Sequence, residues 1–361
     1  AEDAMRALSA ALGRGFGARG LATLDTSRAH ISKTAFWIAG WRAEETAKGD
    51  AAAIHDPLAV AFLEAGGRAA FHELRAFFEA PAARRGALRA AAAEVTNALD
   101  RHGSAGLLQA ELFLSRVGGW TPWALARADH VRRTAFVDGA CLEAVGRGVR
   151  QVVVVGAGLD TRAYRLFPPT PGLRLYEVDH PDVFAYKQLV LDRAGAVTAC
   201  DRAVVGVEYG EVSAWEEKAR AQGFDPAQPT AFILEGLIPY LHLDAQRALL
   251  ASVARACAPG SCVAGDVLAF EEGAGFMRAM QAGPAAGIDL YSTQAPWLSQ
   301  ALQEAPFPAA VEVEVLETRG DALAKRLGQD PMPWWPQEMQ PHQRYFFHAR
   351  VGGTGTGAGG R

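Results

Sequence analysis

A short run of valines that ends in a glycine pair constrains the fold of this 361-residue chain more than any other segment. Gln151 is followed by Val152–Val155 and then by Gly156-Ala157-Gly158. A continuous β-branched run of this length is typical of a strand that is buried on both faces, as strands of a parallel sheet are. Glycines directly after a strand let the backbone turn tightly and approach a ligand that a Cβ atom would exclude. The segment therefore predicts a parallel sheet with a ligand at its carboxyl end.

The rest of the second half of the chain alternates between short strands and helices. Strands are expected at 173–178, 203–207, 231–234 and 262–268, and helices at 212–221 and 244–257. This order predicts βαβ units with right-handed crossovers, and so a doubly wound α/β sheet. The last two strands are expected at 310–316 and 344–351, and the first of them alternates valine with glutamate, which indicates one buried face.

The chain divides by composition into four parts. Residues 1–30 are predicted to form an N-terminal arm, and the alanine-rich stretch 31–147 a helical cap. Residues 148–351 are predicted to form the sheet domain, interrupted at 271–308 by a Gly-rich, aromatic lid insertion. The tail 352–361 is almost entirely Gly, Thr and Ala, which favours disorder.

Composition excludes several classes of protein. Half of the residues are hydrophobic and 21% are charged, so the chain can bury a large core without a metal or a disulfide. The net charge of −4 provides no basic field for nucleic acid or an anionic membrane, and no uncharged run reaches the roughly 18 residues of a membrane span. The four cysteines, Cys141, Cys200, Cys257 and Cys262, lack metal-ligand spacing, so we expect buried thiols in a cytoplasmic protein. The net charge favours a small-molecule substrate.

The residues around the glycine turn indicate which ligand it takes. Thr161 stands where a dinucleotide-binding turn has its third glycine, and no Gly-Lys-Ser follows, so NAD and ATP are both disfavoured. The next strand ends at Asp179, about 20 residues beyond the glycines, where a carboxylate can hold a ribose diol. The alternative for Asp179 is a helix N-cap before Pro181.

Three segments, in this order, resemble the leucine carboxyl methyltransferase family: VVVVGAGLDTRAYRL at 152–166, YEVDHP at 176–181 and LEGLIPYL at 234–241. Looser agreement extends from about Ser32 to Leu268 and includes His55-Asp56-Pro57-Leu58-Ala59 and Arg133-Thr134. The family includes protein-phosphatase carboxyl methyltransferases and many bacterial small-molecule O-methyltransferases. The resemblance implies the fold of a class I S-adenosylmethionine (SAM) dependent methyltransferase, a Rossmann-like, mostly parallel sheet with an antiparallel last strand.

The resemblance also implies roles for individual residues. Arg133 pairs with the SAM carboxylate, Asp179 holds the ribose, and the methionine moiety lies against the turn formed by Gly156, Ala157, Gly158 and Asp160. A guanidinium binds a carboxylate bidentately, which makes the first of these roles chemically sensible.

Two further positions complete the expected cofactor site. Where the family usually has Asp-Leu beside the adenine, this chain has Glu208-Tyr209, which keeps an acceptor for the amino group and adds a ring to stack on the base. Glu235 follows an apolar strand and is expected to face the same crevice, since an unpaired buried carboxylate would be costly. For the family's N-terminal basic residue, Lys33 and Arg42 are both candidates.

Methyl transfer from a sulfonium requires alignment and exclusion of water more than it requires a catalytic triad, and no triad is apparent. A carboxylate acceptor is already nucleophilic at neutral pH, whereas a phenol or alcohol needs a base. Tyr240 is the candidate to orient the acceptor oxygen; His180 and His242 are possible bases but fit capping or surface positions better.

An acceptor pocket could be lined by aromatic and methionine side chains of the insertion, or these could pack within the lid itself. The candidates are Phe276, Met277, Met280, Tyr291 and Trp297, and the Trp334-Trp335 pair is expected to fold over the same opening.

We therefore predict a SAM-dependent O-methyltransferase that converts SAM to S-adenosylhomocysteine and methylates a small-molecule carboxylate, with a natural-product hydroxyl as the nearest alternative. Alternatives of other classes are a nicotinamide-dependent oxidoreductase and a SAM-binding protein without turnover. The Ala, Gly and Arg bias resembles that of GC-rich bacterial genomes, where such enzymes often modify secondary metabolites. The sequence does not indicate an oligomeric state.

Overall fold

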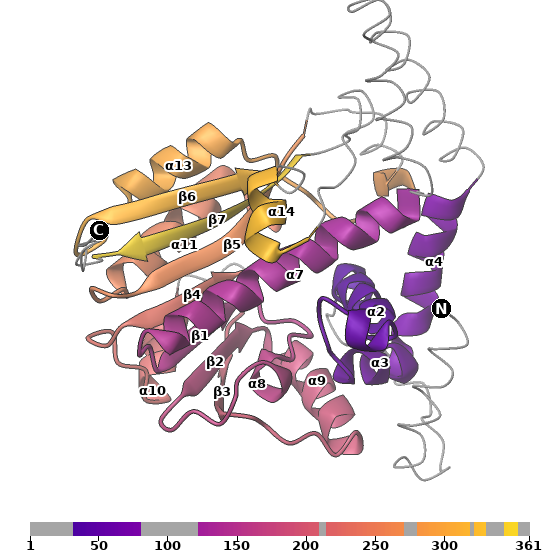
Figure 1. Cartoon of the computed structure of the whole chain (residues 1–361), viewed down its shortest axis with the longest axis horizontal. Coiled ribbons are helices and arrows are strands. Elements are labelled where there is room, and N and C mark those ends of the chain that lie inside the picture. The colour runs from indigo at the N-terminus through magenta and orange to yellow at the C-terminus, as the bar shows by residue number, and fades with distance from the viewer. Residues whose placement is uncertain are drawn as a thin grey trace, which may run out of the picture.

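A seven-stranded sheet forms the centre of the protein, whose computed structural model describes residues 32–80, 122–208, 214–270, 280–317, 321–329 and 343–352 (Figure 1). The strand order is β3-β2-β1-β4-β5-β7-β6. The strands are β1 (Gln151–Val155), β2 (Arg174–Asp179), β3 (Asp201–Gly206), β4 (Thr230–Leu234), β5 (Cys262–Ala269), β6 (Val311–Glu317) and β7 (Gln343–Val351).

The first five strands are parallel, and β7 runs antiparallel between β5 and β6. The predicted mostly parallel sheet with an antiparallel last strand is thus confirmed. The chain order reverses between β1 and β4, because β1 is followed on one side by β2 and on the other by β4. At such a reversal the loops after neighbouring strands diverge and leave a crevice at the carboxyl ends, which is where ligands bind in open α/β sheets.

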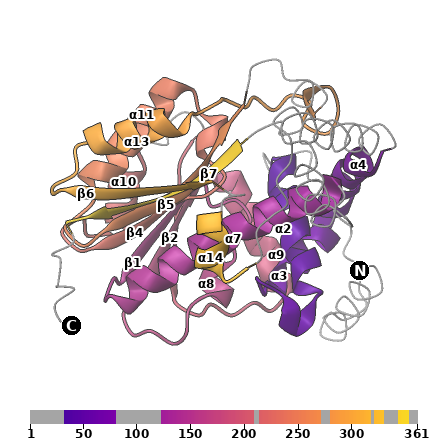
Figure 2. The ribbon, with the colours of Figure 1, turned by 45° about the horizontal axis from the view of Figure 1, so that its top comes forward.

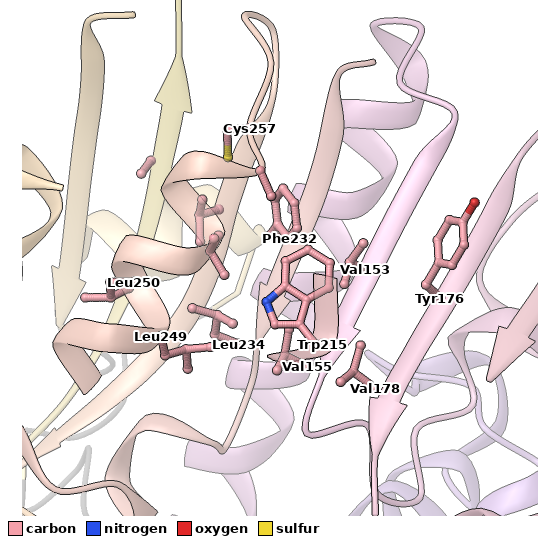
Figure 3. Packing of buried hydrophobic residues seen from close by; sticks show 14 of the residues in the cluster. Val153, Val155, Tyr176, Val178, Trp215, Phe232, Leu234, Leu249, Leu250 and Cys257 are labelled. Atoms are coloured by element: carbon pink, nitrogen blue, oxygen red, sulfur yellow. The ribbon is translucent and has the colours of Figure 1, made fainter. Parts of the chain in front are cut away.

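Helices cover both faces of the sheet. Trp215 of α10 and Leu250 of α11 pack on one face, where Figure 3 shows the Trp215 ring next to Phe232, Val153 and Val155. The other face is covered by α7, α8, α9 and α14. The helices of this domain are α7 (Pro122–Gly146), α8 (Arg162–Arg165), α9 (Pro181–Arg193), α10 (Trp215–Ala221), η4 (Ile238–Tyr240), α11 (Leu243–Arg255), α13 (Ala295–Glu304) and α14 (Asp321–Leu327).

The N-terminal helices form a separate group beside the sheet (Figures 1 and 2). Trp37 and Trp41 of α2 pack with Phe71 of α4 and with Trp123 at the start of α7. The helical elements in this group are α2 (Lys33–Thr46), η1 (Gly49–Ala51), α3 (Leu58–Phe62), the π-helical η2 (Leu63–Gly67) and α4 (Arg68–Glu79).

Helix α7 belongs to both groups, although the sequence places it wholly in the helical cap. Its first turn carries Trp123 in the N-terminal aromatic cluster, whereas Phe136, Val137 and Cys141 pack on the sheet. The two groups are therefore joined by one continuous helix.

Several expected features lie outside the described residues: the arm 1–30, part of the cap, Phe276 and Met277 of the lid, the Trp334-Trp335 pair and most of the tail. Within the described ranges, no helix is both long enough and apolar enough to cross a bilayer.

Candidate cofactor and acceptor site

The glycine turn after β1 has the backbone geometry that the sequence predicts. Gly156 and Gly158 have φ angles of +71° and +42°, in the left-handed region that favours glycine. The N–H groups of Gly156 and Ala157 both donate to the carbonyl oxygen of Val178, at 2.8 and 3.0 Å, and so fasten the turn to β2. A Cβ atom at Gly156 would lie 3.0 Å from Leu237 Cδ1. A side chain at Gly156 would therefore be strained by the backbone and would press on Leu237.

Asp179, at the end of β2, faces this turn. Its Oδ2 accepts from the Gly158 N–H at 2.6 Å, and its Oδ1 accepts from the His180 N–H at 2.7 Å. Burial raises the pKa of this carboxyl, although the two backbone hydrogen bonds oppose the shift. A carboxylate has about four acceptor positions, so two remain for a ligand.

A cavity of about 510 Å³ opens over the glycine turn at the carboxyl end of the sheet. Its volume falls in the range of small-molecule sites. Apart from Tyr209, which lies outside the described residues, every residue predicted to bind the cofactor lines it, and so does Tyr240. These residues are Arg133, Gly156, Ala157, Gly158, Asp160, Asp179, Glu208, Glu235 and Tyr240. The structure thus brings together residues from five separate stretches of the chain.

Glu235 and Arg133 form a buried ion pair in the cavity wall. Arg133 Nε donates to Glu235 Oε1 at 2.9 Å, and the Thr134 hydroxyl donates to the same oxygen at 2.8 Å. Burial alone would raise the pKa of Glu235, but the guanidinium groups of Arg162 and Arg133 lower it well below its usual range. A negative and a positive charge therefore lie side by side at one wall of the cavity.

Arg162, which sequence reasoning did not single out, ties three carboxylates together beneath the cavity. It donates to Glu235 and Asp160, and through Nε to Asp138 Oδ1 at 2.7 Å. Asp160 also accepts from the Arg162 N–H at 2.7 Å. Asp160 thus lines the cavity while its oxygens are engaged by Arg162. In the sequence, the one indication of this network is that Arg162 follows Asp160 by two residues. Its other two partners, Asp138 and Glu235, are distant in the chain.

The two candidates for the N-terminal basic residue have different surroundings. Arg42 lines the cavity; its Nε donates to Asp56 Oδ2 at 2.7 Å and its Nη2 to the carbonyl oxygen of Leu159 at 2.7 Å. Lys33 is exposed and pairs with Glu73 at 3.2 Å. Thr161, at the position of the missing third glycine, donates to the same Asp56 oxygen at 2.7 Å. Arg42 is therefore the basic residue of this helix that reaches the site.

Both candidate histidines occupy helix starts. His180 Nδ1 accepts from the Asp182 N–H at 3.2 Å, so the ring proton lies on Nε2 and is donated to Glu208 Oε2 at 3.0 Å. Both ring nitrogens of His180 are thus used in capping α9 and holding Glu208. His242 precedes α11, its ring lies 4.1 Å from that of Tyr291 at an angle of 37°, and it is not among the residues that line the cavity.

Tyr240 lies in η4 and lines the cavity. Burial raises the pKa of its phenol, and a hydrogen bond from the Thr34 side chain opposes that shift. The hydroxyl is therefore protonated at neutral pH and has a proton that it can donate in a hydrogen bond.

The described residues of the insertion pack elsewhere. Met280 joins the cluster of the N-terminal helices, and Trp297 packs against the sheet core together with Leu298 and Leu302 of α13. The Tyr291 N–H donates to the carbonyl oxygen of Pro239 at 2.7 Å. Met280, Tyr291 and Trp297 are not among the residues that line the cavity.

The model of the family described as leucine carboxyl methyltransferase matches residues 35–254, which is more than half of the chain. The chain belongs to the leucine carboxyl methyltransferase family. The matched region contains the glycine turn, Asp179, Arg133, Glu235 and Tyr240, so most of the residues that line the cavity belong to the part of the chain that matches the family.

Similar proteins occur in actinobacteria. A Mycolicibacterium gilvum protein named "Putative S-adenosyl-L-methionine-dependent methyltransferase" is 47% identical over 132 residues, which cover 37% of this chain and 42% of that protein. A Mycobacteroides abscessus protein of the same name is 36% identical over 204 residues, covering 55% of this chain and 65% of that protein. The matches thus span between about two fifths and two thirds of these relatives' length.

Among solved structures, a Thermobifida fusca protein described as a "putative methyltransferase" resembles the chain with a TM-score of 0.45 at 17% identity, covering 72% of this chain and 94% of that one. At these values the likeness bears on neither substrate nor activity. Within the part of this family member that the structure describes, no group of three or more His, Cys, Asp or Glu side chains could hold a metal ion.

Proposed function

We propose that this protein is a SAM-dependent O-methyltransferase that methylates a carboxylate of a small molecule. The observation that carries the proposal is the cavity itself, where a glycine turn, a buried carboxylate and an ion pair surround one space. The family match and the names of the relatives support the same activity.

The residues present fit the chemical groups of SAM. The left-handed Gly156 and Gly158 leave room that a Cβ atom would occupy, and Asp179 retains free acceptor positions for ribose hydroxyls. Arg133 uses Nε for Glu235, and its terminal nitrogens, of which Nη1 lies 3.8 Å from Asp266 Oδ2, can still donate to a ligand carboxylate. Glu235 beside it matches an ammonium group, so the pair presents both charges that an amino-acid moiety requires. Glu208 accepts from an adenine amino group.

When bound, SAM supplies an activated methyl group on a positively charged sulfur. The protein then has to align the acceptor and exclude water. Tyr240 donates to an acceptor oxygen from its neutral hydroxyl, and His180, which also lines the cavity, already has both ring nitrogens engaged. An acceptor that needs no base fits this arrangement, and a carboxylate is ionised and nucleophilic at neutral pH.

The cofactor is tested by isothermal calorimetry with SAM, S-adenosylhomocysteine and NAD. We expect SAM and S-adenosylhomocysteine to bind, and Asp179→Ala and Arg133→Ala to weaken SAM binding at least about tenfold, as the loss of a charged hydrogen bond predicts. Asp192→Ala, on the exposed side of α9, is the matched control and should bind normally. Binding of NAD without SAM would show a nicotinamide-dependent oxidoreductase instead.

The acceptor is tested by screening carboxylic acids and phenols for S-adenosylhomocysteine formation. Methylation of a carboxylate should have a nearly flat rate from about pH 6 to 8, whereas a hydroxyl acceptor loses rate as its base becomes protonated. SAM binding without turnover on any acceptor would indicate a SAM-binding protein rather than an enzyme.

We also propose a cytoplasmic enzyme of secondary metabolism. All four cysteines are free, as expected in a reducing compartment, and the Ala, Gly and Arg bias is that of genomes in which such enzymes modify natural products. Growth of a deletion strain followed by comparison of its extracted metabolites would test this role.

A further inference from the structure

His180 connects two carboxylates where β2 and β3 end at the cavity. Its backbone N–H donates to Asp179 Oδ1 at 2.7 Å, and its ring Nε2 lies 3.0 Å from Glu208 Oε2. The other ring nitrogen, Nδ1, accepts from the Asp182 N–H at 3.2 Å, so the ring proton lies on Nε2 and is donated to Glu208. Asp179, His180 and Glu208 all line the cavity. One histidine therefore contacts both the carboxylate proposed to hold the ribose and the one proposed to hold the base.

The backbone fixes the position of Glu208 but not the direction of its carboxylate. Strands β2 and β3 pair as far as Asp179 and Gly206, and the Val207 N–H then donates to the carbonyl oxygen of Asp179 at 2.9 Å. Glu208 follows directly, and 63% of its side chain is exposed. An exposed glutamate has several rotatable bonds and samples many rotamers. The hydrogen bond from His180 therefore restricts a carboxylate that solvent would leave free to turn.

The direction of this carboxylate decides which base the cavity can select. Val183 and Val207, which are close in the chain to His180 and Glu208, are buried and line the cavity, but their side chains form no hydrogen bonds with a base. A carboxylate only accepts hydrogen bonds, so an exocyclic amino group can donate to it. A 6-oxopurine has a carbonyl oxygen at the same position, and two acceptors repel each other. A carboxylate that is held in place therefore distinguishes the two bases.

We propose that His180 is a positioning residue that directs the Glu208 carboxylate at the exocyclic amino group of the cofactor's base, so that the site selects a 6-aminopurine over a 6-oxopurine. The proposal rests on the proposed function and adds a residue that determines its cofactor specificity. Because the carboxylate is already ordered before the ligand arrives, binding does not have to restrict the Glu208 side chain again. A carboxylate has about four acceptor positions, so the hydrogen bond from His180 leaves others for the amino group.

Two substitutions separate the contact with Glu208 from the capping of α9. His180→Asn keeps an acceptor for the Asp182 N–H, since asparagine is a preferred N-cap, but its side chain is too short to reach Glu208. His180→Gln has a longer side chain whose amide can donate to Glu208, while glutamine is a poor N-cap. In differential scanning fluorimetry without ligand, His180→Asn should therefore unfold with the parent and His180→Gln about 1 to 2 °C lower.

Specificity is measured by calorimetry with S-adenosylhomocysteine and with S-inosylhomocysteine, which has a carbonyl oxygen in place of the amino group. The parent should bind the first about 10- to 100-fold more tightly. His180→Asn should reduce this preference about 3- to 10-fold by weakening S-adenosylhomocysteine alone, whereas His180→Gln and the exposed control Asp192→Asn should keep it. Equal weakening of both ligands would show a merely structural role, and tighter binding of S-adenosylhomocysteine would show that His180 holds Glu208 away from the base. Either result would overturn the proposal.

A double-mutant cycle shows whether His180 acts through Glu208. Glu208→Ala should remove most of the preference for S-adenosylhomocysteine, and adding His180→Asn to that variant should change the preference no further. Additive losses would contradict the proposal. A preference that is unchanged in His180→Asn would refute only the role of His180, whereas a parent protein that binds neither ligand would refute the proposed function and this proposal with it.

The contact itself is tested without any ligand. In ¹⁵N NMR spectra of histidine-labelled protein, with the His180 signals assigned from His180→Asn, the ring should carry its proton on Nε2. Glu208→Ala should shift the Nε2 signal, because the ring loses its acceptor, and Asp192→Asn should leave that signal in place. A ring that carries its proton on Nδ1, or an Nε2 signal that is the same in Glu208→Ala and the parent, would show that His180 does not position Glu208.

Discussion

Arg42 donates from Nη2 to the carbonyl oxygen of Leu159 at 2.7 Å, although the two residues are 117 positions apart in the chain. Its Nε donates at the same time to the fully buried carboxylate of Asp56. Burial alone would raise the pKa of Asp56, but Arg42 and Arg165 lower it below its ordinary value. One guanidinium therefore fastens the N-terminal helices to the glycine turn.

Replacement of this guanidinium should destabilise the protein. We expect Arg42→Met to lower the free energy of unfolding by about 3 kcal/mol, since it leaves Asp56 buried with Thr161 and a more distant Arg165, and breaking a buried pair costs about 3–5 kcal/mol. Urea unfolding measures the difference. Arg68→Met removes an exposed pair with Glu64 and should cost less than about 1 kcal/mol. Equal losses in the two variants would contradict the role of Arg42.

Glu235→Gln tests the ion pair in the cavity wall. Because the pKa of Glu235 is lowered in the folded protein, its charge stabilises the fold above the unfolded pKa, and this contribution is lost as the pH falls through the folded pKa. At pH 7 we expect a loss of about 3 kcal/mol, and a smaller difference between variant and parent in acid. Thermal unfolding at several pH values provides the measurement. Glu312→Gln, on the exposed side of β6, is the control and should change stability by about 0.5 kcal/mol or less.

Asp179 should make SAM binding dependent on pH. Its carboxyl has a raised pKa, so it becomes protonated at a higher pH than an exposed aspartate, whose pKa is about 3.9. In the proposed site the charged form accepts hydrogen bonds from the ribose hydroxyls, so SAM affinity should fall on acidification, and the fall should begin at a pH above 3.9. Calorimetry across this range checks the slope, which Asp179→Ala should abolish. An affinity that stays constant down to pH 4 would exclude the ionised carboxylate from binding.

The raised pKa of Asp179 also predicts an effect on stability. A carboxyl whose pKa is raised in the folded state stabilises the fold only while it is protonated, and this contribution is lost as the pH rises through the folded pKa. At neutral pH the buried charge is therefore a cost to the ligand-free protein. We expect Asp179→Asn, which is neutral like the protonated carboxyl, to unfold at a temperature no lower than the parent at pH 7 while binding SAM poorly; differential scanning fluorimetry without and with SAM measures both.

The thiols should react in an order set by burial. Burial raises the pKa of Cys200 to about 11 and that of Cys262 to about 12, and it raises the pKa of Cys141 and Cys257 as well. Because the thiolate is the reactive form, alkylation at pH 8 should be slow and should begin at the half-buried Cys200. Mass spectrometry after iodoacetamide treatment identifies the site, and Cys200→Ser should remove the first labelled species. Early labelling of Cys141 would contradict this order.

The sheet could be predicted from the sequence because the residue pattern of each strand and turn favours the same conformation that the folded structure imposes on it. The valine run, the glycine turn and Asp179 each have a conformational reason that is visible in the residues themselves. Each of the first five observed strands begins or ends within two residues of its predicted range. By contrast, the extent of the helical cap could not be predicted from the sequence. The sequence of α7 is alanine-rich throughout, although the helix packs against two different cores.

The choice between Lys33 and Arg42 shows what spacing cannot decide. The two residues are nine positions apart in α2, which is about two and a half turns, so they point to opposite sides of the helix. Which side faces the cavity depends on how α2 packs, and that depends on aromatic residues of α4 and α7. The Arg162 network was missed for the same reason, since Asp138, Asp160 and Glu235 come together only in the folded chain.

The position of Arg133 in α7 has a mechanical consequence. This helix of 25 residues is about 37 Å long, with one end fixed among the tryptophans of the N-terminal helices and the other fixed on the sheet. Arg133 lies between the two anchored ends, so its position depends on how the N-terminal helices sit relative to the sheet. A ligand held at Arg133 and at the glycine turn links both bodies, and its binding energy resists their separation. Occupancy of the cavity should therefore protect the distant Trp123 cluster from opening as strongly as it protects the site itself.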